Sequence, residues 1–302
     1  MQRVYAADSN YFALLKQDNL DNPVLLKFAP HIYMILSRKK VVLPNQCIKK
    51  ENPQVEIEIE GVKRIFKYKL VTKEGACEMK SNILLTTENN SFSLKYEDGE
   101  EIQNGQIHLL MNQWTYDGII DEKTAKQMKW DVLYVGQAKG RNGDRMAMDR
   151  LEDHSTLQKI YFEKSEKYPN QDIWLLLLSF DHGRFNGSRI YSKDDAVDEQ
   201  AINIIEGALI KYFDPKYNHQ LKNTFPNPNH QSYRSFYTAG YSAINVVCTL
   251  EHTDINFATY IGTKQTGYEK SHIIRYTLQD GVEDKQDLKR MHVHLTKPLF
   301  GL

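Results

Sequence analysis

An arginine and a histidine stand four residues apart in "MAMDRLEDHSTLQKIY", a stretch whose apolar residues recur at helical spacing. Arg150, His154 and Tyr161 fall on one stripe of the predicted helix, with the first two near its start. The start of a helix presents backbone N–H groups that favour anions, and an arginine adds a fork of donors that matches a phosphate. The spacing therefore predicts a phosphate-binding site at this helix start.

A carboxylate borders the apolar stripe of a second predicted helix, "AINIIEGALIKYF". Glu206 lies at the edge of that stripe, where it is expected to be half-buried and to face inward. A half-buried carboxylate needs a partner, and a divalent cation is one candidate. Asn218 follows the helix, after the proline turn in "DPKYN". The stripe itself consists of Ile202, Ile205, Leu209 and Phe213.

Two patterns along the chain predict the elements that hold these residues. From residue 54 to 96, apolar and charged residues alternate about turns, as in β-hairpins. From about residue 105, predicted strands ("QIHLLMNQW", "DVLYVGQA", "DIWLLLLSF") alternate with predicted helices at 146–168 and 194–213. The residues from 239 onward predict strands with a short helix near 282–290, and a helix is predicted around 11–16.

These patterns predict three parts. Residues 1–104 form a β-rich module, 105–225 an α/β core, and 226–302 a β-rich extension. Appended parts of this kind commonly select a target or a partner for a small core that carries the chemistry.

The composition predicts an ordinary globular protein. The chain has 39 Lys and Arg against 39 Asp and Glu, so its net charge of zero disfavours nucleic-acid binding by charge alone. No apolar run is long enough to span a membrane, and the first residues lack the basic-then-apolar order of a signal peptide. The three cysteines are scattered and indicate reduced thiols. We therefore expect a cytoplasmic protein with no membrane partner.

Four features resemble the GIY-YIG nuclease superfamily. "LYVGQAKG" is similar to the strand that ends in its Tyr-Ile/Val-Gly motif, and Arg150 with His154 matches the arginine and histidine of the helix that follows. On spacing alone, Arg145 is the alternative arginine. "EGALIKYFDPKYN" matches the helix of the catalytic glutamate and the asparagine after it, here Glu206 and Asn218. The resemblance covers residues 105–218.

The resemblance implies an α/β (α+β) core, a small and mostly antiparallel sheet flanked by helices, that hydrolyses DNA phosphodiesters. It implies that Glu206 holds Mg²⁺ or Mn²⁺ and that Arg150 binds the scissile phosphate. Tyr134 is implied on the nucleophile side, with His154 as its proton-relay partner. The other implied site residues are Lys139 and Asn218, which support catalysis, and Gly136, Arg145 and Lys211, which bind substrate.

The first motif of the superfamily, Gly-Ile-Tyr, has no literal copy on the strand predicted before Tyr134. His108 stands where its tyrosine would fall in "GQIHLLMN", and "TYDGII" offers Tyr116 or a degenerate Gly118-Ile119-Ile120. A more literal Tyr-Ile-Gly begins at Tyr260, but no glutamate helix follows it, so we interpret it as a strand end.

The sequence thus predicts a metal-dependent DNA endonuclease of restriction or anti-phage defence. A homodimer or a regulatory protein subunit is a possible partner in addition to DNA. The alternative is a catalytically silent or partner-activated nucleic-acid-binding protein. The two differ in whether Arg150 and Glu206 face one site together with a tyrosine.

Overall fold

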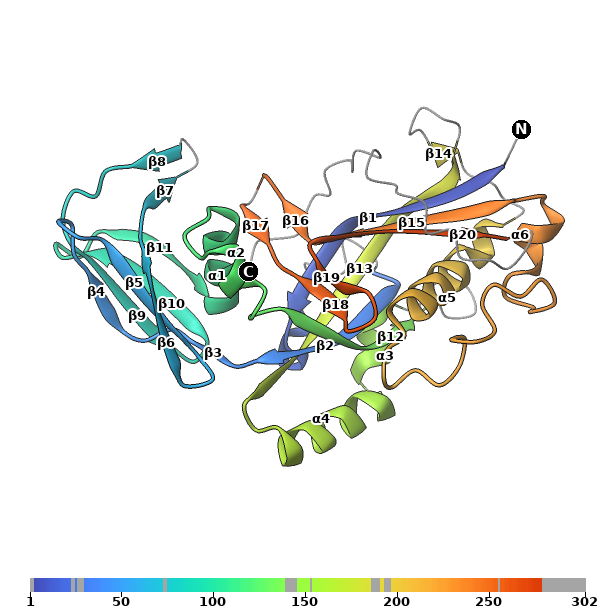
Figure 1. Ribbon diagram of the computed structural model, residues 1–302, viewed down its shortest axis with the longest axis horizontal. Helices are drawn as coiled ribbons and strands as arrows, with labels where there is room; N and C mark the ends of the chain where they lie inside the picture. The colour runs from blue at the N-terminus through green and yellow to red at the C-terminus, as the bar shows by residue number, and fades with distance from the viewer. Residues whose placement is uncertain are drawn as a thin grey trace.

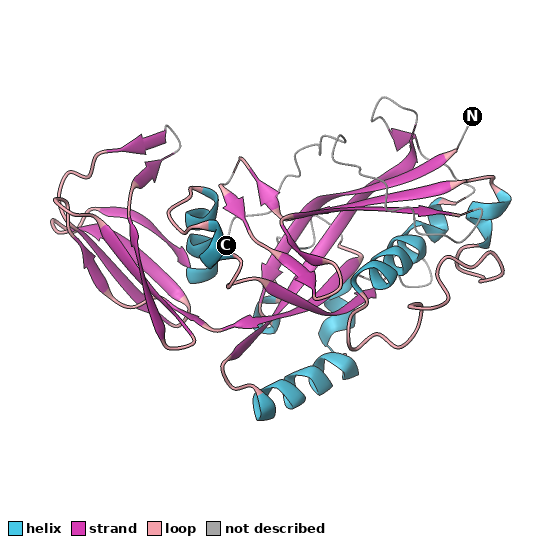
Figure 2. Cartoon of the chain, viewed as in Figure 1, coloured by secondary structure: helices cyan, strands magenta, loops and turns pink. Residues whose placement is uncertain are grey.

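The computed structural model describes residues 3–22, 25, 30–72, 75–138, 146–152, 154–185, 191–192, 197–254 and 256–278. The fold is mostly β, with 44% strand and 22% helix (Figure 2). Two predicted site residues, Lys139 and Arg145, and the predicted helix at 282–290 lie outside the described residues.

The largest sheet has nine strands. Eight follow the order β19-β18-β12-β2-β13-β1-β15-β20, and β14 pairs with β13 (Figure 1). The path of eight curls into a nearly closed, barrel-like sheet. Its strands are β1 (Val4–Leu15), β2 (Ile32–Lys39), β12 (Trp130–Gln137), β13 (Gln171–Phe185), β14 (Tyr191–Ser192), β15 (Ala243–Thr249), β18 (Ile261–Thr263), β19 (Gly267–Glu269) and β20 (Ser271–Thr277).

The predicted fold class, a small sheet flanked by helices, is wrong. Strand β2 lies between β12 and β13 and is antiparallel to both. Strand β1 then pairs with β13 on one side and with β15 on the other, which brings the two ends of the chain into the same sheet. Apolar periodicity identifies a strand but not its partner, so strands far apart in the sequence looked like separate modules.

The helix predicted around residues 11–16 is the end of strand β1. Phe12 and Leu14 pack in one core cluster, whereas Leu15 packs in another, on the opposite face of the sheet. A strand covered on both faces is apolar on both sides, and such a run cannot be told from a short helix by its periodicity.

Residues 41–129 form a module inserted between β2 and β12, at the left of Figure 1. It has its own core, built around residues such as Ile57, Phe92 and Trp114. The boundary predicted at 104/105 therefore does not divide an N-terminal module from a core, because β1 and β2, which precede it, belong to the central sheet. The module contains β3 (Val41–Val42), β4 (Gln46–Ile48), β5 (Gln54–Ile59), β6 (Val62–Lys67), β7 (Leu70–Thr72), β8 (Gly75–Cys77), β9 (Ile83–Glu88), β10 (Ser91–Tyr96), β11 (Glu101–Gln106), α1 (Ile107–Tyr116) and α2 (Glu122–Ala125).

Helix α1 occupies the segment predicted as the first strand of the core. Its buried residues include His108, Met111 and Asn112, at the spacing of one helix face. The apolar part of this segment is too short for its periodicity to decide between a strand and a helix.

The C-terminal strands are part of the central sheet and not a separate extension. Strand β20 pairs with β15, and Ile261 of β18 lies beside Trp130 of β12 in a parallel pair. The Tyr-Ile-Gly at Tyr260 thus leads into a short strand next to β12. The remaining short elements are η1 (Gln17–Asn19), η3 (Asp198–Gln200), α6 (Arg234–Thr238), β16 (Glu251–His252) and β17 (Phe257–Ala258).

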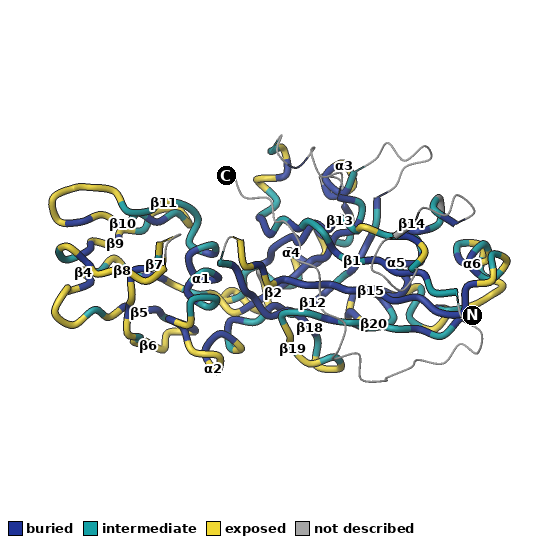
Figure 3. The backbone as a smooth tube through the Cα atoms, turned by 90° about the horizontal axis from the view of Figure 1, so that it is seen from above, coloured by how far each residue is buried: buried dark blue, intermediate teal, exposed yellow. Residues whose placement is uncertain are grey.

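Helices cover both faces of the central sheet. Helix α5 (Ala201–Phe213) packs in the core of one face, and α3 (Ala147–Glu152) and α4 (Ser155–Lys167) pack in the core of the other. The central strands are accordingly buried along most of their length, while the inserted module is largely exposed at its turns (Figure 3). Among the described helices, none has the length and apolar character needed to cross a membrane.

Candidate functional site

Two tyrosines from strands far apart in the chain share one face of the central sheet. Tyr33 of β2 lies opposite Gly136 of β12, and this register places it diagonal to Tyr134 on the same face. The ring centroids of Tyr33 and Tyr134 are 6.1 Å apart, and their planes differ by 29°. The β2–β12 pairing thus brings a second tyrosine to the one that the sequence had indicated.

Gly136 leaves the space that the two rings occupy. A Cβ atom at this position would lie 2.5 Å from Cζ and 2.6 Å from Oη of Tyr33, and 2.7 Å from Cε1 of Tyr134. Side chains do not approach this closely, so glycine is required for a packing reason. Gly136 was predicted to bind substrate, and in the structure its contribution is to let the two phenol rings meet.

The helix predicted at 146–168 is two helices, with His154 at the start of the second. His154 has extended backbone angles (φ −86°, ψ 103°) and is the N-cap of α4. Its Nδ1 atom accepts the backbone N–H of Leu157 at 3.1 Å, and its Nε2 atom lies 2.8 Å from the Tyr33 hydroxyl. Arg150 and His154 therefore reach the site from two consecutive helices and not from one helical stripe.

These two hydrogen bonds fix the tautomer of His154. A backbone N–H can only donate, so Nδ1 carries no proton and the neutral ring is protonated at Nε2. His154 consequently donates to the Tyr33 oxygen. Burial, together with the charge of Arg150, lowers the pKa of His154 to about 4, so the ring is neutral at pH 7. Its predicted role as a proton relay would need Nδ1, which the helix cap already uses.

Arg150 connects the tyrosine pair to the carboxylate. It is exposed in α3, yet its guanidinium is close enough to the Tyr33 hydroxyl to lower the pKa of that phenol. Its charge also acts on Tyr134, His154 and Glu206. An exposed guanidinium beside two phenols and one carboxylate is well placed to bind an incoming anion such as a phosphate.

Both tyrosines are protonated at neutral pH. Burial raises the pKa of Tyr33 well above its usual range, and the neighbouring Tyr134 and Glu206 add to that effect. Burial and Glu206 likewise raise the pKa of Tyr134. Arg150 opposes both shifts, because its positive charge favours a phenolate.

Glu206 enters the site from helix α5, at the end of strand β12. Its carboxylate lies near Gln137, the last residue of β12, whose backbone N–H and side-chain amide both favour the charged form. Burial raises the pKa of Glu206 to about 7, although Gln137 and Arg150 lower it. The carboxylate therefore sits in an environment that a cation would stabilise.

The donor set fits a hard cation that keeps most of its water. Glu206 offers carboxylate oxygens, and the buried Oε1 atom of Gln137 has no hydrogen-bond partner among the described residues. In the same part of the chain, no three His, Cys, Asp or Glu side chains gather as they would around a fully protein-bound metal. Mg²⁺ and Mn²⁺ accept such sites, since Mg²⁺ commonly binds through one or two carboxylates plus waters and substrate phosphates.

Asn218 braces strand β12 from the side. Its Oδ1 atom accepts the N–H of Val135 at 2.9 Å, and its Nδ2 atom donates to the Val135 carbonyl at 2.8 Å. The backbone N–H of Tyr217 adds a bond to Leu133 O at 3.0 Å. The turn after α5 thus pairs with β12 on either side of Tyr134, and Asn218 braces that strand.

Three further residues from the sequence analysis have no described contact with the tyrosine pair. Lys211 follows Glu206 by five positions on α5, and a helix of about 3.6 residues per turn places them on different sides. His108 packs on Trp174, with ring centroids 4.3 Å apart, on the opposite face of the sheet from Tyr33. Tyr116 ends α1 in the inserted module. Neither His108 nor Tyr116 is therefore the partner of Tyr134.

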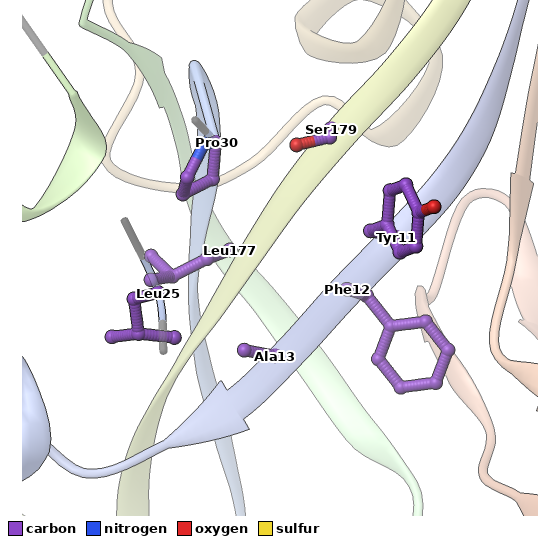
Figure 4. Close-up of a pocket in the computed structure, with 7 residues that line it drawn as sticks. All are labelled: Tyr11, Phe12, Ala13, Leu25, Pro30, Leu177 and Ser179. Carbon is purple, nitrogen blue, oxygen red and sulfur yellow. The ribbon is translucent and has the colours of Figure 1, made fainter. Parts of the chain in front are cut away.

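A small apolar pocket lies next to the site, between β1, β13 and the segment before β2 (Figure 4). Leu177 in its wall is the neighbour of Tyr33 across the β2–β13 pair. The lining offers no carboxylate, imidazole or cation, so the reactive groups lie beside this pocket and not in it. Its lining residues are Tyr11, Phe12, Ala13, Leu25, Pro30, Leu177 and Ser179.

The sequence analysis missed Tyr33 and Gln137. Tyr33 stands in "HIYMIL", which is typical of a buried strand, and nothing local indicates its pairing with β12. Gln137 directly follows the Tyr-Val-Gly tripeptide, and this position was the signal available for it. Comparison of the chain with protein-family models, curated proteins and solved structures gives no match.

Proposed function

We propose that this protein is a metal-dependent DNA endonuclease related to the GIY-YIG nucleases. One observation carries the proposal: Tyr33, Tyr134, Arg150, His154 and Glu206, from five separate elements, interact with one another through hydrogen bonds, ring contacts and charge. Arg150 and Glu206 act on each other and on both tyrosines by charge, and this arrangement supports the nuclease over the silent binding protein.

His31-Ile32-Tyr33 would be the counterpart of the Gly-Ile-Tyr motif. It precedes the Tyr134 strand in the chain, as that motif should, and is separated from it by the inserted module. The strand of Tyr33 is antiparallel to the strand of Tyr134 and adjacent to it. The missing Gly-Ile-Tyr and the neutral charge favour the alternative of a silent binding protein, and Tyr33 weighs against the first of these two points.

The contacts suggest a role for each group. Arg150 binds the scissile phosphate and offsets the charge that develops on it. Tyr33, which is protonated at neutral pH, orients the attacking water through its hydroxyl, and the water gives its proton to solvent while the new O–P bond forms and the bond to the leaving oxygen breaks. The leaving oxygen takes its proton from solvent. When bound at Glu206, Mg²⁺ or Mn²⁺ supplies positive charge to the phosphate and the leaving oxygen.

The surroundings of Tyr33 support its place on the nucleophile side. His154 donates to its hydroxyl oxygen and the positive charge of Arg150 acts on it, so the phenol proton is left to bond the attacking water. Tyr134, first assigned to this role, packs on Tyr33 and on His154, with ring centroids 5.3 Å from the latter. Tyr134 therefore holds these two side chains in place and lines the approach of the water.

Restriction or anti-phage defence in the cytoplasm remains the biological setting that we propose. A chain with one such site would cut both strands of a duplex most directly as a dimer. A dimeric mass in the presence of DNA together with double-strand breaks supports this arrangement. A monomer that makes blunt double-strand breaks contradicts it.

The function is tested by incubating supercoiled plasmid, phage DNA and single-stranded DNA with the full chain in Mg²⁺, in EDTA, and with the Glu206→Gln variant. The proposal predicts cleavage in Mg²⁺ that is lost in EDTA and in the variant. Glu122→Gln is the matched control, because Glu122 is an exposed carboxylate of the inserted module that pairs with Lys126 at 2.7 Å, and it should cut like wild type. Equal cleavage by wild type and Glu206→Gln would contradict the proposal.

A further inference from the structure

A chain of amide side chains leads from helix α5 to the end of strand β12. The Nδ2 atom of Asn203 donates to Oε1 of Gln200 at 2.5 Å, and the Nε2 atom of Gln137 donates to Oδ1 of Asn203 at 2.6 Å. Gln200 directly precedes α5, and it is followed at intervals of three by Asn203 and Glu206. Residues at this spacing lie on one side of a helix, so all three face the end of β12.

This series of amide hydrogen bonds determines which way the Gln137 amide points. The two ends of an amide have nearly the same shape, and only their partners distinguish oxygen from nitrogen. Because the N–H₂ group of Asn203 is directed to Gln200, its oxygen is turned to Gln137 and needs a donor there. Nε2 of Gln137 supplies it, and Oε1 is left on the side away from Asn203.

The same amide also contacts the carboxylate of Glu206. The side-chain amide and the backbone N–H of Gln137 both lower the pKa of Glu206, so these donors favour the charged carboxylate. Meanwhile the Oε1 atom of Gln137 is buried without a partner among the described residues. A buried acceptor in this state is costly, and a water molecule held by a cation would satisfy it.

We propose that Gln137 is a positioning residue for the cation site at Glu206, with its amide oriented by Asn203 and Gln200. Gln137 lies beside the carboxylate, with Nε2 bonded to Asn203, and presents its oxygen to the water shell of a divalent cation. This inference rests on the proposed function only in that it takes Glu206 to bind the cation. A glutamine that served packing alone would gain nothing from an oriented amide or from its contact with Glu206.

The test measures binding of Mn²⁺ to the full chain without DNA. The electron paramagnetic resonance signal of free Mn²⁺ reports how much of the metal is bound. Gln137→Met keeps the size of the side chain and removes its hydrogen bonds. Loss of a residue that orients a metal ligand typically weakens metal binding by about 10- to 100-fold, and we expect this for Gln137→Met. Asn203→Leu, which leaves Gln137 and Glu206 intact, should weaken binding several-fold.

Gln103→Met is the matched control, because the Gln103 amide bonds Gln113 at 2.8 Å within the inserted module. It should bind Mn²⁺ like wild type, and thermal melts of all variants verify that they are folded. Wild-type affinity in folded Gln137→Met, with binding lost in Glu206→Gln, would overturn the role of Gln137 and leave the proposed function standing. Equal binding by wild type and Glu206→Gln would overturn both.

Discussion

His154 donates its Nε2 proton to the hydroxyl of Tyr33 across 2.8 Å, although the two residues are 121 positions apart in the chain. The direction of this bond follows from the start of helix α4, where Nδ1 of the same ring accepts the N–H of Leu157. A helix cap thus decides which proton faces the tyrosine. His154 is a fixed donor to Tyr33, and any negative charge on Tyr33 would be stabilised by it.

The fixed tautomer predicts the NMR spectrum of His154. In ¹⁵N-labelled protein at pH 7, its Nε2 should resonate as a protonated nitrogen and its Nδ1 as an unprotonated one. The ring should titrate near pH 4, because burial and Arg150 lower its pKa to about 4. The spectrum of His154→Asn assigns the signal. A proton on Nδ1, or titration near pH 6.5, would contradict this account.

The same pKa gives a pH dependence of stability. The ring binds its proton less readily in the folded than in the unfolded chain, so between about pH 4 and 6.5 the unfolded state holds more protons and stability rises with pH. This contribution is complete above about pH 6.5, is lost as the pH falls to about 4, and is at most about 3 kcal/mol. When the free energy of unfolding is measured with urea from pH 4 to 7, it should rise less steeply with pH in His154→Asn than in wild type. Part of the rise should remain in the variant, because burial also lowers the pKa of His108 and His272.

Substitution of Gly136 should separate the tyrosine pair. Gly136→Ala places a Cβ where the Tyr33 and Tyr134 rings lie, so we expect a loss of about 1–3 kcal/mol in the free energy of unfolding and a large loss of cleavage. Gly118→Ala is the control. Its φ of +68° costs stability by backbone strain, but a Cβ there meets no atom within 4 Å and should leave cleavage unchanged in the folded protein. Full activity of Gly136→Ala would show that the ring contact is dispensable.

Removal of Asn218 should loosen strand β12. Asn218→Ala leaves the buried N–H and C=O groups of Val135 without their partners, at a cost of about 1–3 kcal/mol each. Hydrogen exchange at the Val135 amide should accelerate accordingly, and urea unfolding should shift to lower concentrations. Unchanged exchange at Val135 would mean that Asn218 does not brace the strand.

Much of the site follows from local sequence. Arg150, Glu206 and Asn218 were identifiable because each belongs to, or directly follows, an amphipathic segment whose periodicity is visible within a few turns. His154 was predicted to lie inside a helix, since the apolar stripe continues through it. In the structure a new helix begins after His154, which is its N-cap, and periodicity cannot detect such a break.

Tyr33 could not be found in this way. Its strand is buried on both faces and carries no alternation, and the inserted module separates it from its partner strand. The same non-local pairing explains why the fold class was wrong. The C-terminal strands were predicted as strands and the end of β1 as a helix, but the order β13-β1-β15 depends on tertiary packing. His108 and Tyr116 were considered for the missing tyrosine because they lie between the start of the predicted core and the strand of Tyr134.

The measurement that tests the central claim most directly is single-turnover plasmid cleavage in Mg²⁺ by Tyr33→Phe and Tyr116→Phe, beside wild type. Tyr33→Phe keeps the ring and loses only the hydroxyl, so the account predicts a rate lower by about 100- to 10,000-fold with DNA binding retained. Tyr116→Phe should cut like wild type. Wild-type cleavage by folded Tyr33→Phe would contradict the account, and a loss confined to Tyr116→Phe would assign the tyrosine to the inserted module instead.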